Sequence, residues 1–189
     1  MIPPELLLQG YRLGIFPMAM EDDSIEWFSP ERRGIIPLET FHLPHGARRT
    51  WARKSFEVKI DTAFSDVIRA CARRDETWIN HEIVASYENL HALGHAHSVE
   101  AWQKGKLAGG LYGVAIGGAF FGESMFHRVT DASKIALLFL IEHLRGRGAT
   151  WLDCQVMTPH MSALGAREIT RNRFLDMLAK EQAAGRSLF

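Results

Sequence analysis

Two polar residues stand out in the segment Thr150–Val156, which is otherwise apolar and is typical of a buried strand. Because side chains alternate along a strand, Trp151, Asp153 and Gln155 are expected on one face. A carboxylate and an amide are costly to bury without hydrogen-bond partners. The pair therefore indicates either a structural hydrogen bond between the strand and a loop, or a site that holds a polar group of a substrate.

A second carboxylate, Glu123, lies in the apolar stretch Gly122–Phe126. On a half-exposed strand, such a residue simply faces water. Alternation also places Glu123 and Phe120 on opposite faces of the strand. A β-bulge at Gly122 would bring both side chains round to one site, so a shared role for them requires that bulge.

Other kinds of chemistry are poorly supported. His91, His95 and His97 have a spacing that raises the question of a metal site, but no nearby cysteine or acidic residue completes a ligand set. The chain has no G-x-S-x-G segment, and neither a P-loop nor a dinucleotide-binding motif is present. We expect no metal ion and no cofactor.

Composition limits the partners. The 189 residues carry 22 basic and 22 acidic side chains, so the formal net charge is zero. Proteins that hold nucleic acid mainly through phosphates are usually basic, and any RNA contact here must therefore be local. His42–Lys54 is a candidate, because basic side chains surround Trp51 without any acid, although a solvated surface loop is the commoner interpretation of such a stretch.

Cysteine usage and the N-terminal sequence indicate the compartment. Cys71 and Cys154 have no paired spacing and are interpreted as buried thiols rather than as a disulfide. The N-terminus has no basic segment followed by a long apolar run, and no membrane-length apolar stretch follows. We therefore expect a cytoplasmic protein that makes no membrane contact.

Apolar periodicity predicts an α+β fold in two parts. Six of the seven prolines fall within residues 1–44, which predicts a small, loop-rich N-terminal lobe over residues 1–55 with one short helix after Pro4. Residues 56–189 are expected to form the catalytic domain. Its predicted strands are 56–60, 97–103, 107–116, 119–126 and 150–156. Its predicted helices begin after the candidate N-caps Asp61 and Asn80 and cover 132–145, 160–165 and 171–182.

Antiparallel hairpins, then a buried helix, then another strand are compatible with a GNAT-like acyltransferase domain, which has a mixed, largely antiparallel sheet and a central helix. A GNAT acetyltransferase needs a glycine-rich turn before that helix to hold the CoA pyrophosphate. The corresponding junction, His127–Lys134, contains no glycine. If the fold is of this type, the acyl donor is expected not to be acyl-CoA.

Several short segments, taken in order, closely resemble the leucyl/phenylalanyl-tRNA–protein transferases. They are Tyr11–Pro17, Trp27–Pro30, Arg33–Pro37, Thr77–Ile79, Leu93–Glu100, Gly109–Ala115, Gly122–Phe126, Ala132–Lys134, Asp153–Gln155 and Leu164–Arg167. Each segment is weak alone, but their order over most of the chain is specific. Three positions depart from the family pattern: Phe28 stands where a second Trp is common, and Leu140 and Leu144 stand where aromatic residues are frequent.

The resemblance implies a small N-terminal lobe packed on a GNAT-like domain. It implies transfer of Leu, Phe or Met from aminoacyl-tRNA to the α-amine of proteins or peptides that begin with Arg or Lys, which marks proteins for N-end rule degradation. Neither ATP nor a metal is needed, because the aminoacyl ester is already activated. We expect a monomer.

The same resemblance suggests roles for individual residues. Gln155 would accept a hydrogen bond from the attacking amine, Asp153 would hold Gln155, and Glu123 would bind the acceptor's cationic side chain or help fix Gln155. Whether Gln155 acts as a base or only positions the amine stays open, since a neutral amide is a poor proton acceptor. Trp78, Leu111, Phe120, Leu140 and Leu144 would line the donor side-chain pocket, and Trp27 would stack on the terminal adenosine.

Two other functions remain to be weighed. One is an acyl-CoA-dependent N-acetyltransferase, which the fold favours and the missing glycine-rich turn opposes. The other is a non-catalytic adaptor that recognises N-terminal Arg or Lys through Glu123 and Asp153. Tight binding of CoA would support the first, and peptide binding that is indifferent to charged tRNA would support the second.

Overall fold

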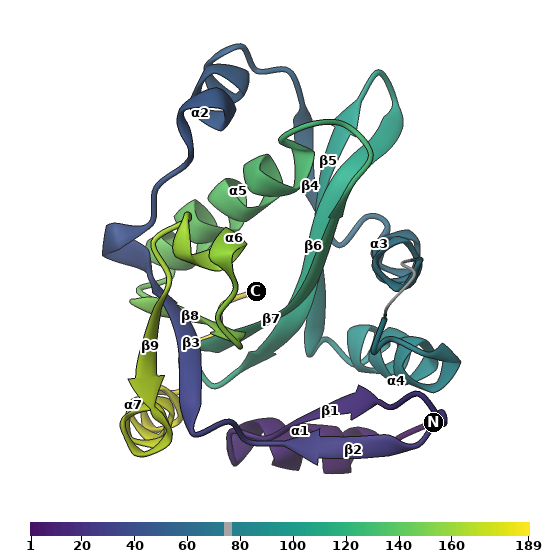
Figure 1. Ribbon diagram of the computed structural model, residues 1–189, viewed down its shortest axis with the longest axis vertical. Helices are drawn as coiled ribbons and strands as arrows, with labels where there is room; N and C mark the ends of the chain where they lie inside the picture. Colours follow the sequence, from purple (N-terminus) through teal and green to yellow (C-terminus); the bar gives the residue numbers. More distant parts are fainter. Residues whose placement is uncertain (74–76) are drawn as a thin grey trace.

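A seven-stranded mixed sheet organises the protein in the computed structural model, which describes residues 1–73 and 77–189 (Figure 1). The strands are β1 (Phe16–Ala19), β2 (Ile25–Phe28), β3 (Arg32–Pro37), β4 (Glu57–Ile60), β5 (Ala96–Gln103), β6 (Lys106–Ile116), β7 (Ala119–His127), β8 (Trp151–Gln155) and β9 (Arg167–Thr170). The α-helices are α1 (Pro4–Arg12), α2 (His45–Ala52), α3 (Phe64–Ala72), α4 (His81–Ala92), α5 (Ala132–Gly146), α6 (Pro159–Ser162) and α7 (Arg171–Ala184), and a 3₁₀ turn, η1, covers Leu38–Thr40.

The central sheet has the order β4-β5-β6-β7-β8-β3-β9, and β1 pairs with β2 in a separate small sheet. All recorded pairings in the central sheet are antiparallel except β7 with β8, which are parallel and meet at the pair Phe121–Asp153. This parallel junction joins the β4–β7 meander to the β8-β3-β9 part of the sheet. The two carboxylates singled out in the sequence, Glu123 and Asp153, therefore lie on adjacent strands.

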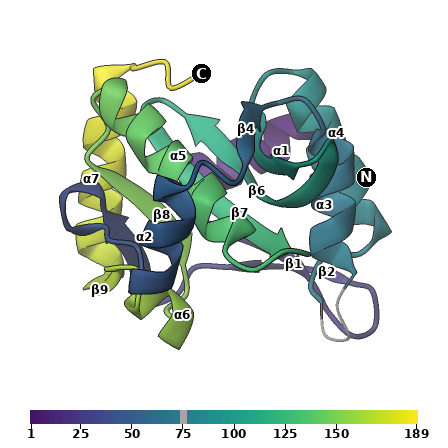
Figure 2. The same ribbon diagram turned by 90° about the horizontal axis from the view of Figure 1, so that it is seen from above.

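Helices cover both faces of the sheet (Figures 1 and 2). Helix α5 packs on one face, and α3 and α4 pack on the other. The amphipathic pattern of α3 explains its orientation, because Phe64, Val67, Ile68 and Cys71 recur at helical spacing and all are buried. Helix α5 buries residues over most of its circumference, as predicted for a helix buried against the sheet.

The predicted elements of residues 56–189 are confirmed in type, with small shifts at their ends. Asn80 caps α4 as expected, since its Oδ1 accepts a hydrogen bond from the Ile83 backbone N–H at 3.0 Å. The predicted cap at Asp61 is wrong. Helix α3 begins at Phe64, and the Asp61 carboxylate instead accepts from the backbone N–H of Ser98 at 2.8 Å. Strand β9 was not predicted because its four residues are mostly exposed and show no apolar alternation.

The N-terminal 55 residues contain more regular structure than the loop-rich lobe predicted from their prolines. The short helix after Pro4 is confirmed as α1, but the same region also supplies β1, β2, β3 and α2. Strand β3 lies in the central sheet between β8 and β9, so this part of the chain pairs with the strand that carries Asp153 and Gln155. The division of the chain at residue 55 stays a prediction.

Neither cysteine forms a disulfide among the described residues. Cys71 is buried as predicted, whereas Cys154 is only partly buried. No helix in the described part of the chain combines the length and the apolar character that crossing a bilayer requires.

Candidate active site

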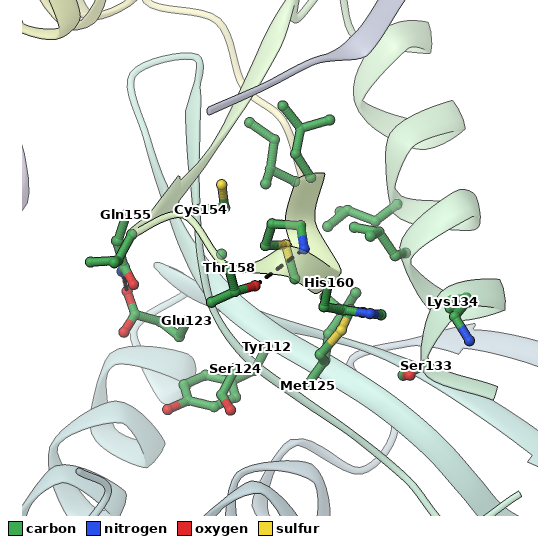
Figure 3. A pocket seen from close by; sticks show the side chains of 18 of the residues that line it. Tyr112, Glu123, Ser124, Met125, Ser133, Lys134, Cys154, Gln155, Thr158 and His160 are labelled. Carbon is green, nitrogen blue, oxygen red and sulfur yellow. Dashed lines mark hydrogen bonds between the residues drawn. The ribbon is translucent and has the colours of Figure 1, made fainter. Parts of the chain in front are cut away.

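A cavity of about 630 Å³ lies between β7, β8 and α5, as Figure 3 shows from close by. Its apolar walls come from Phe16, Met18, Ile36, Trp78, Leu111, Met125, Leu137, Leu140, Leu152 and Met161. Volumes of roughly 300–1,000 Å³ are usual for sites that hold small molecules or the end of a larger ligand. The polar residues Glu123 and Gln155 also line it, so an apolar chamber adjoins hydrogen-bonding groups.

A bulge in β7 turns Glu123 into this site. Across the β6–β7 ladder, Gly113 pairs with Gly122 and Tyr112 pairs with Ser124, which leaves Glu123 as the extra residue. The sequence made a shared site for Phe120 and Glu123 conditional on a bulge at Gly122, and the structure has a bulge next to that position, with Glu123 as the extra residue. Gly113 is required opposite it, because a Cβ atom there would lie 2.3 Å from the Phe121 carbonyl oxygen.

A second irregularity presents Gln155 at the end of β8. Gly34 pairs with Gln155 and Ile35 pairs with Asp153, so Cys154 is the extra residue on β8. Gln155 has φ of 62°, a left-handed conformation that is uncommon for a residue with a side chain. Gln155 lines the cavity whereas Asp153 does not, so simple alternation does not describe the end of this strand.

The two irregular positions bring Glu123 and Gln155 into direct contact. The Gln155 amide nitrogen Nε2 donates to Glu123 Oε1 over 2.7 Å, and both side chains are less than 10% exposed. Because the amide NH₂ group is directed to the carboxylate, the amide oxygen Oε1 is the atom of Gln155 that can accept a hydrogen bond from a ligand. The contact thus fixes which end of the amide acts as an acceptor.

Two buried tyrosines hold Glu123 from the other side. The Tyr11 hydroxyl donates to Glu123 Oε1 over 2.7 Å, the Tyr87 hydroxyl lies 3.4 Å from Oε2, and the two hydroxyls also contact each other. Burial raises the pKa of Glu123 from 4.5 to about 7, and the charge of Asp153 acts in the same direction. The hydrogen bonds from Tyr11 and Gln155 stabilise the carboxylate and oppose the rise.

This shifted pKa predicts a pH-dependent contribution to stability. Because the Glu123 pKa is higher in the folded protein than in the unfolded chain, the native state retains the proton between pH 4.5 and about 7, and stability falls as the pH rises through that window. The loss amounts to about 3 kcal/mol, since one pKa unit corresponds to about 1.4 kcal/mol. Urea unfolding of wild-type protein and Glu123→Gln between pH 4.5 and 8 measures it. The variant should lack this part of the pH dependence, and parallel curves for the two proteins would contradict the assignment.

Asp153 forms a buried ion pair with Arg33 on β3. Arg33 Nε lies 2.8 Å from Oδ1 and Nη2 lies 2.6 Å from Oδ2, and a third guanidinium nitrogen, Nη1, donates to the Gly14 carbonyl at 3.0 Å. The guanidinium also lies between the rings of Phe16 and Phe174. Asp153 Oδ1 further accepts from the Gln155 backbone N–H at 3.1 Å. The ion pair therefore anchors the backbone that presents Gln155.

The structure places the predicted donor-pocket residues in two groups. Trp78, Leu111 and Leu140 line the cavity. Phe120 is fully buried over Gly113 and near Phe189. Leu144 lies one helical turn beyond Leu140 and is fully buried in the core between α5 and the sheet. Neither of these two side chains is among the lining residues. The bulge at Glu123 is therefore present without bringing Phe120 to the cavity.

Trp27 also lies outside the cavity lining. It is on β2, 37% exposed, and its ring packs so closely on Gly10 that a Cβ atom there would lie 2.5 Å from it. Its stacking on a terminal adenosine stays a prediction. The basic stretch His42–Lys54 includes α2, and Thr50 of this helix donates to Asp131 at 3.0 Å beside the start of α5. Contact of this stretch with RNA likewise stays a prediction.

Two of the three histidines of the 91–97 region, His91 and His97, have structural partners. His97 Nδ1 lies 2.7 Å from Asp61 Oδ2, and His91 Nδ1 lies 2.8 Å from the Ala96 carbonyl oxygen. Within the described ranges, no group of three or more His, Cys, Asp or Glu side chains has an arrangement suited to a metal ion.

Arg33, Tyr11 and Tyr87 were missed as site residues by sequence reasoning. Arg33 and Tyr11 both fall in segments that carry the family resemblance, and Arg33 precedes the apolar run Gly34–Ile36. A charged residue at the start of a buried strand is itself a signal, because it must find a buried partner. Tyr87 fits the apolar face of its helix so well that the sequence offers no separate sign of a polar role.

Fold and site together define an α+β protein with a mixed sheet, in which an apolar cavity adjoins a buried carboxylate–amide pair. Its fold is similar to that of the crystal structure of FemX, with a TM-score of 0.55 at 10% sequence identity, over 92% of this chain and 70% of that one. The family model described as leucyl/phenylalanyl-tRNA protein transferase matches residues 35–179, and the N-terminal domain model of the same name matches residues 1–31. The chain belongs to this family and is an aminoacyltransferase.

Two relatives with the same name as this family match this chain over 95% of its length. The leucyl/phenylalanyl-tRNA–protein transferase of Ruegeria pomeroyi is 52% identical over 95% of this chain and 86% of its own length. The protein of the same name from Herpetosiphon aurantiacus is 51% identical over 95% of this chain and 94% of its own length.

Proposed function

We propose that the protein transfers Leu, Phe or Met from aminoacyl-tRNA to the α-amine of proteins that begin with Arg or Lys, in the cytoplasm and on a GNAT-like fold. The observation that carries this proposal is the position of the Glu123–Gln155 pair at the edge of an apolar cavity. An amino acid esterified to a nucleotide has an apolar side chain next to a reactive carbonyl. The cavity offers a matching chamber next to a hydrogen-bond acceptor.

The reaction needs little acid–base catalysis from the enzyme. The acceptor's α-amine has a pKa of about 7.7–8.0, so a substantial fraction is neutral at physiological pH. Its nitrogen attacks the ester carbonyl carbon, the new amide bond forms, and the bond to the ribose oxygen breaks. The amine loses one proton and the departing ribose oxygen gains one, so no external oxidant, reductant or energy source is required.

Gln155 is the residue that would orient the amine. Its Nε2 is occupied by Glu123, so its Oε1 accepts a hydrogen bond from the amine and directs the nitrogen lone pair to the ester carbon. Holding two reactants in attack geometry accounts for a large part of many enzymatic rate enhancements. A neutral amide needs no unusual pKa for this positioning role, which is why we favour it over general base catalysis.

Glu123 contributes in two ways. It fixes the Gln155 amide, and when ionised it places a negative charge beside the acceptor's cationic N-terminal residue. Both of its oxygens already contact buried groups from Tyr11, Tyr87 and Gln155, which supports the positioning role most directly. Preference for Arg or Lys would then depend on the field of this carboxylate rather than on a bidentate contact.

Substitution of two leucines distinguishes a role in the donor pocket from a role in core packing. Leu140→Ala and Leu144→Ala should each lower the free energy of unfolding by about 2–5 kcal/mol, because both leucines are buried. Only Leu140 lines the cavity, so only Leu140→Ala should change donor choice, raising kcat/KM for Phe-tRNA relative to Leu-tRNA by about tenfold as the pocket widens. Equal changes in donor ratio for the two variants would show that the cavity does not hold the donor side chain.

Transfer of radiolabelled leucine tests the proposed function itself. Purified protein is given Leu-tRNA and one of three peptides that differ only in beginning with Arg, Lys or Met, without ATP or CoA. Label is expected on the Arg and Lys peptides and not on the Met peptide. Label on none of them, with folded protein and intact Leu-tRNA, would reject the proposal, and activity restored only by acyl-CoA would favour an N-acetyltransferase.

A further inference from the structure

The cavity is electrically polarised along its length. Glu123 is the one acidic side chain among the described residues that line it, and the basic lining residues are His127, Lys134 and His160. Figure 3 shows Glu123 and Gln155 at one end and Ser133 and Lys134 at the other, with His160 on the side nearer to Lys134. The carboxylate end suits a cationic acceptor, and the opposite end suits an anion.

The first turn of α5 supplies hydrogen-bond donors at this basic end. Ser133 and Lys134 lie in the first turn of a 15-residue helix, whose N-terminus carries a partial positive charge. The side chain of the N-cap residue Asp131 caps no backbone N–H of this turn. Its carboxylate instead accepts from Lys134 Nζ at 3.1 Å and from Thr50 at 3.0 Å.

Ser133 gives an independent sign of a ligand. Its side chain is only 5% exposed, it lines the cavity, and its hydroxyl makes no hydrogen bond to any residue in the described ranges. Its oxygen is accessible from the cavity rather than enclosed in the core, so a ligand in the cavity can accept a hydrogen bond from this hydroxyl. A hydroxyl beside a lysine and at a helix N-terminus matches the donors that bind a phosphate group.

His160 contributes from the facing segment. It lies in α6, and burial together with the positive charges of Lys134 and His127 lowers its pKa. All three basic groups line the same cavity. An anion placed among them would relieve their repulsion and favour the protonated imidazole.

We propose that Ser133, Lys134 and His160 form a phosphate site, which binds the 5′-phosphate of the donor's terminal nucleoside. This inference rests on the proposed function, because it takes the donor to be an aminoacyl ester of a nucleotide. One phosphate at this end and the reacting ester near Gln155 would orient the donor along the cavity. The absence of glycine from His127–Lys134 agrees with a site for a single phosphate rather than for a pyrophosphate.

Two stable donor analogues test the site by calorimetry. They are 3′-deoxy-3′-(leucylamino)adenosine and the same compound with a 5′-phosphate. Wild-type protein should bind the phosphorylated analogue about tenfold more tightly, as expected for hydrogen bonds to a charged group. Lys134→Ala and Ser133→Ala should reduce that ratio to less than about threefold, while affinity for the unphosphorylated analogue, which also reports on folding, stays unchanged. Lys106→Ala, at an exposed lysine on β6, is the matched control and should keep the wild-type ratio.

The outcomes separate this inference from the function on which it rests. Equal binding of the two analogues by wild-type protein, or an unchanged ratio in both Lys134→Ala and Ser133→Ala, would overturn the phosphate site and leave the transferase proposal standing. Failure of either analogue to bind wild-type protein would instead remove the proposed donor, and the phosphate site with it.

Discussion

Gln155→Ala should lower kcat for leucine transfer by about 100-fold, because misplacing a reactant by about 1 Å can cost that much. The substitution removes the Oε1 acceptor that would orient the amine. Donor binding should be retained, since Gln155 is one of many lining residues and the apolar walls are untouched. Single-turnover transfer from Leu-tRNA measures the rate, and binding of the unreactive leucylamino-adenosine measures donor affinity separately.

Gln155→Asn controls for the backbone at this position. Asn tolerates the left-handed conformation at φ of 62° better than most residues and keeps the amide, but it is one methylene shorter and cannot make the 2.7 Å contact with Glu123 in the same place. We expect it to be nearly as slow as Gln155→Ala. Gln9→Ala, at an exposed position on α1, should transfer at the wild-type rate. Loss of donor affinity in proportion to activity would contradict the positioning role.

Arg33→Met should lower the free energy of unfolding by about 3–5 kcal/mol, the usual result of leaving a buried charge without its partner. Arg33 and Asp153 are 2% and 0% exposed, so solvent does not reach the Asp153 carboxylate to replace the guanidinium. The neighbouring Arg32→Met is the matched control. Arg32 pairs with Glu168 at 3.5 Å on the surface, where such a pair contributes at most about 1 kcal/mol.

A double variant tests whether the cost arises from the uncompensated charge. Arg33→Met combined with Asp153→Leu removes both charges and should be more stable than Arg33→Met alone. Urea unfolding of the four proteins, wild type, Arg32→Met, Arg33→Met and the double variant, provides the comparison. If Arg33→Met proved no more destabilising than Arg32→Met, the ion pair would not anchor β8 as we describe.

Three site residues could be found from the sequence alone, because a polar side chain in an apolar strand is costly to bury and is visible in the few residues around it. Asp153, Gln155 and Glu123 are polar residues in apolar strands, and each had to be either exposed or satisfied. Their partners come from far away along the chain: Arg33 reaches Asp153 across 120 residues, and Tyr11 reaches Glu123 across 112. Periodicity in the sequence does not predict contacts between residues so far apart. The buried network could therefore be recognised only in the folded structure.

The limits of pattern reasoning are clearest at the donor pocket. The resemblance assigned Phe120 and Leu144 to it, and helical spacing places Leu140 and Leu144 on one face of α5. Leu140 lines the cavity, whereas Leu144, one helical turn further on, is buried in the core without lining it. Similarly, prolines in the first 44 residues obscured β3, which pairs with two strands distant in sequence. Short strands of this kind are specified by their neighbours rather than by their own residues.

A crystal structure of the protein with both the leucylamino-adenosine and an Arg-initiated peptide would test the central claim most directly. We expect the leucine side chain among Leu111, Leu140 and Leu152, and the peptide α-amine within hydrogen-bonding distance of Gln155 Oε1. An amine held elsewhere, with Gln155 contacting neither substrate, would contradict the assignment of this site as the place of transfer.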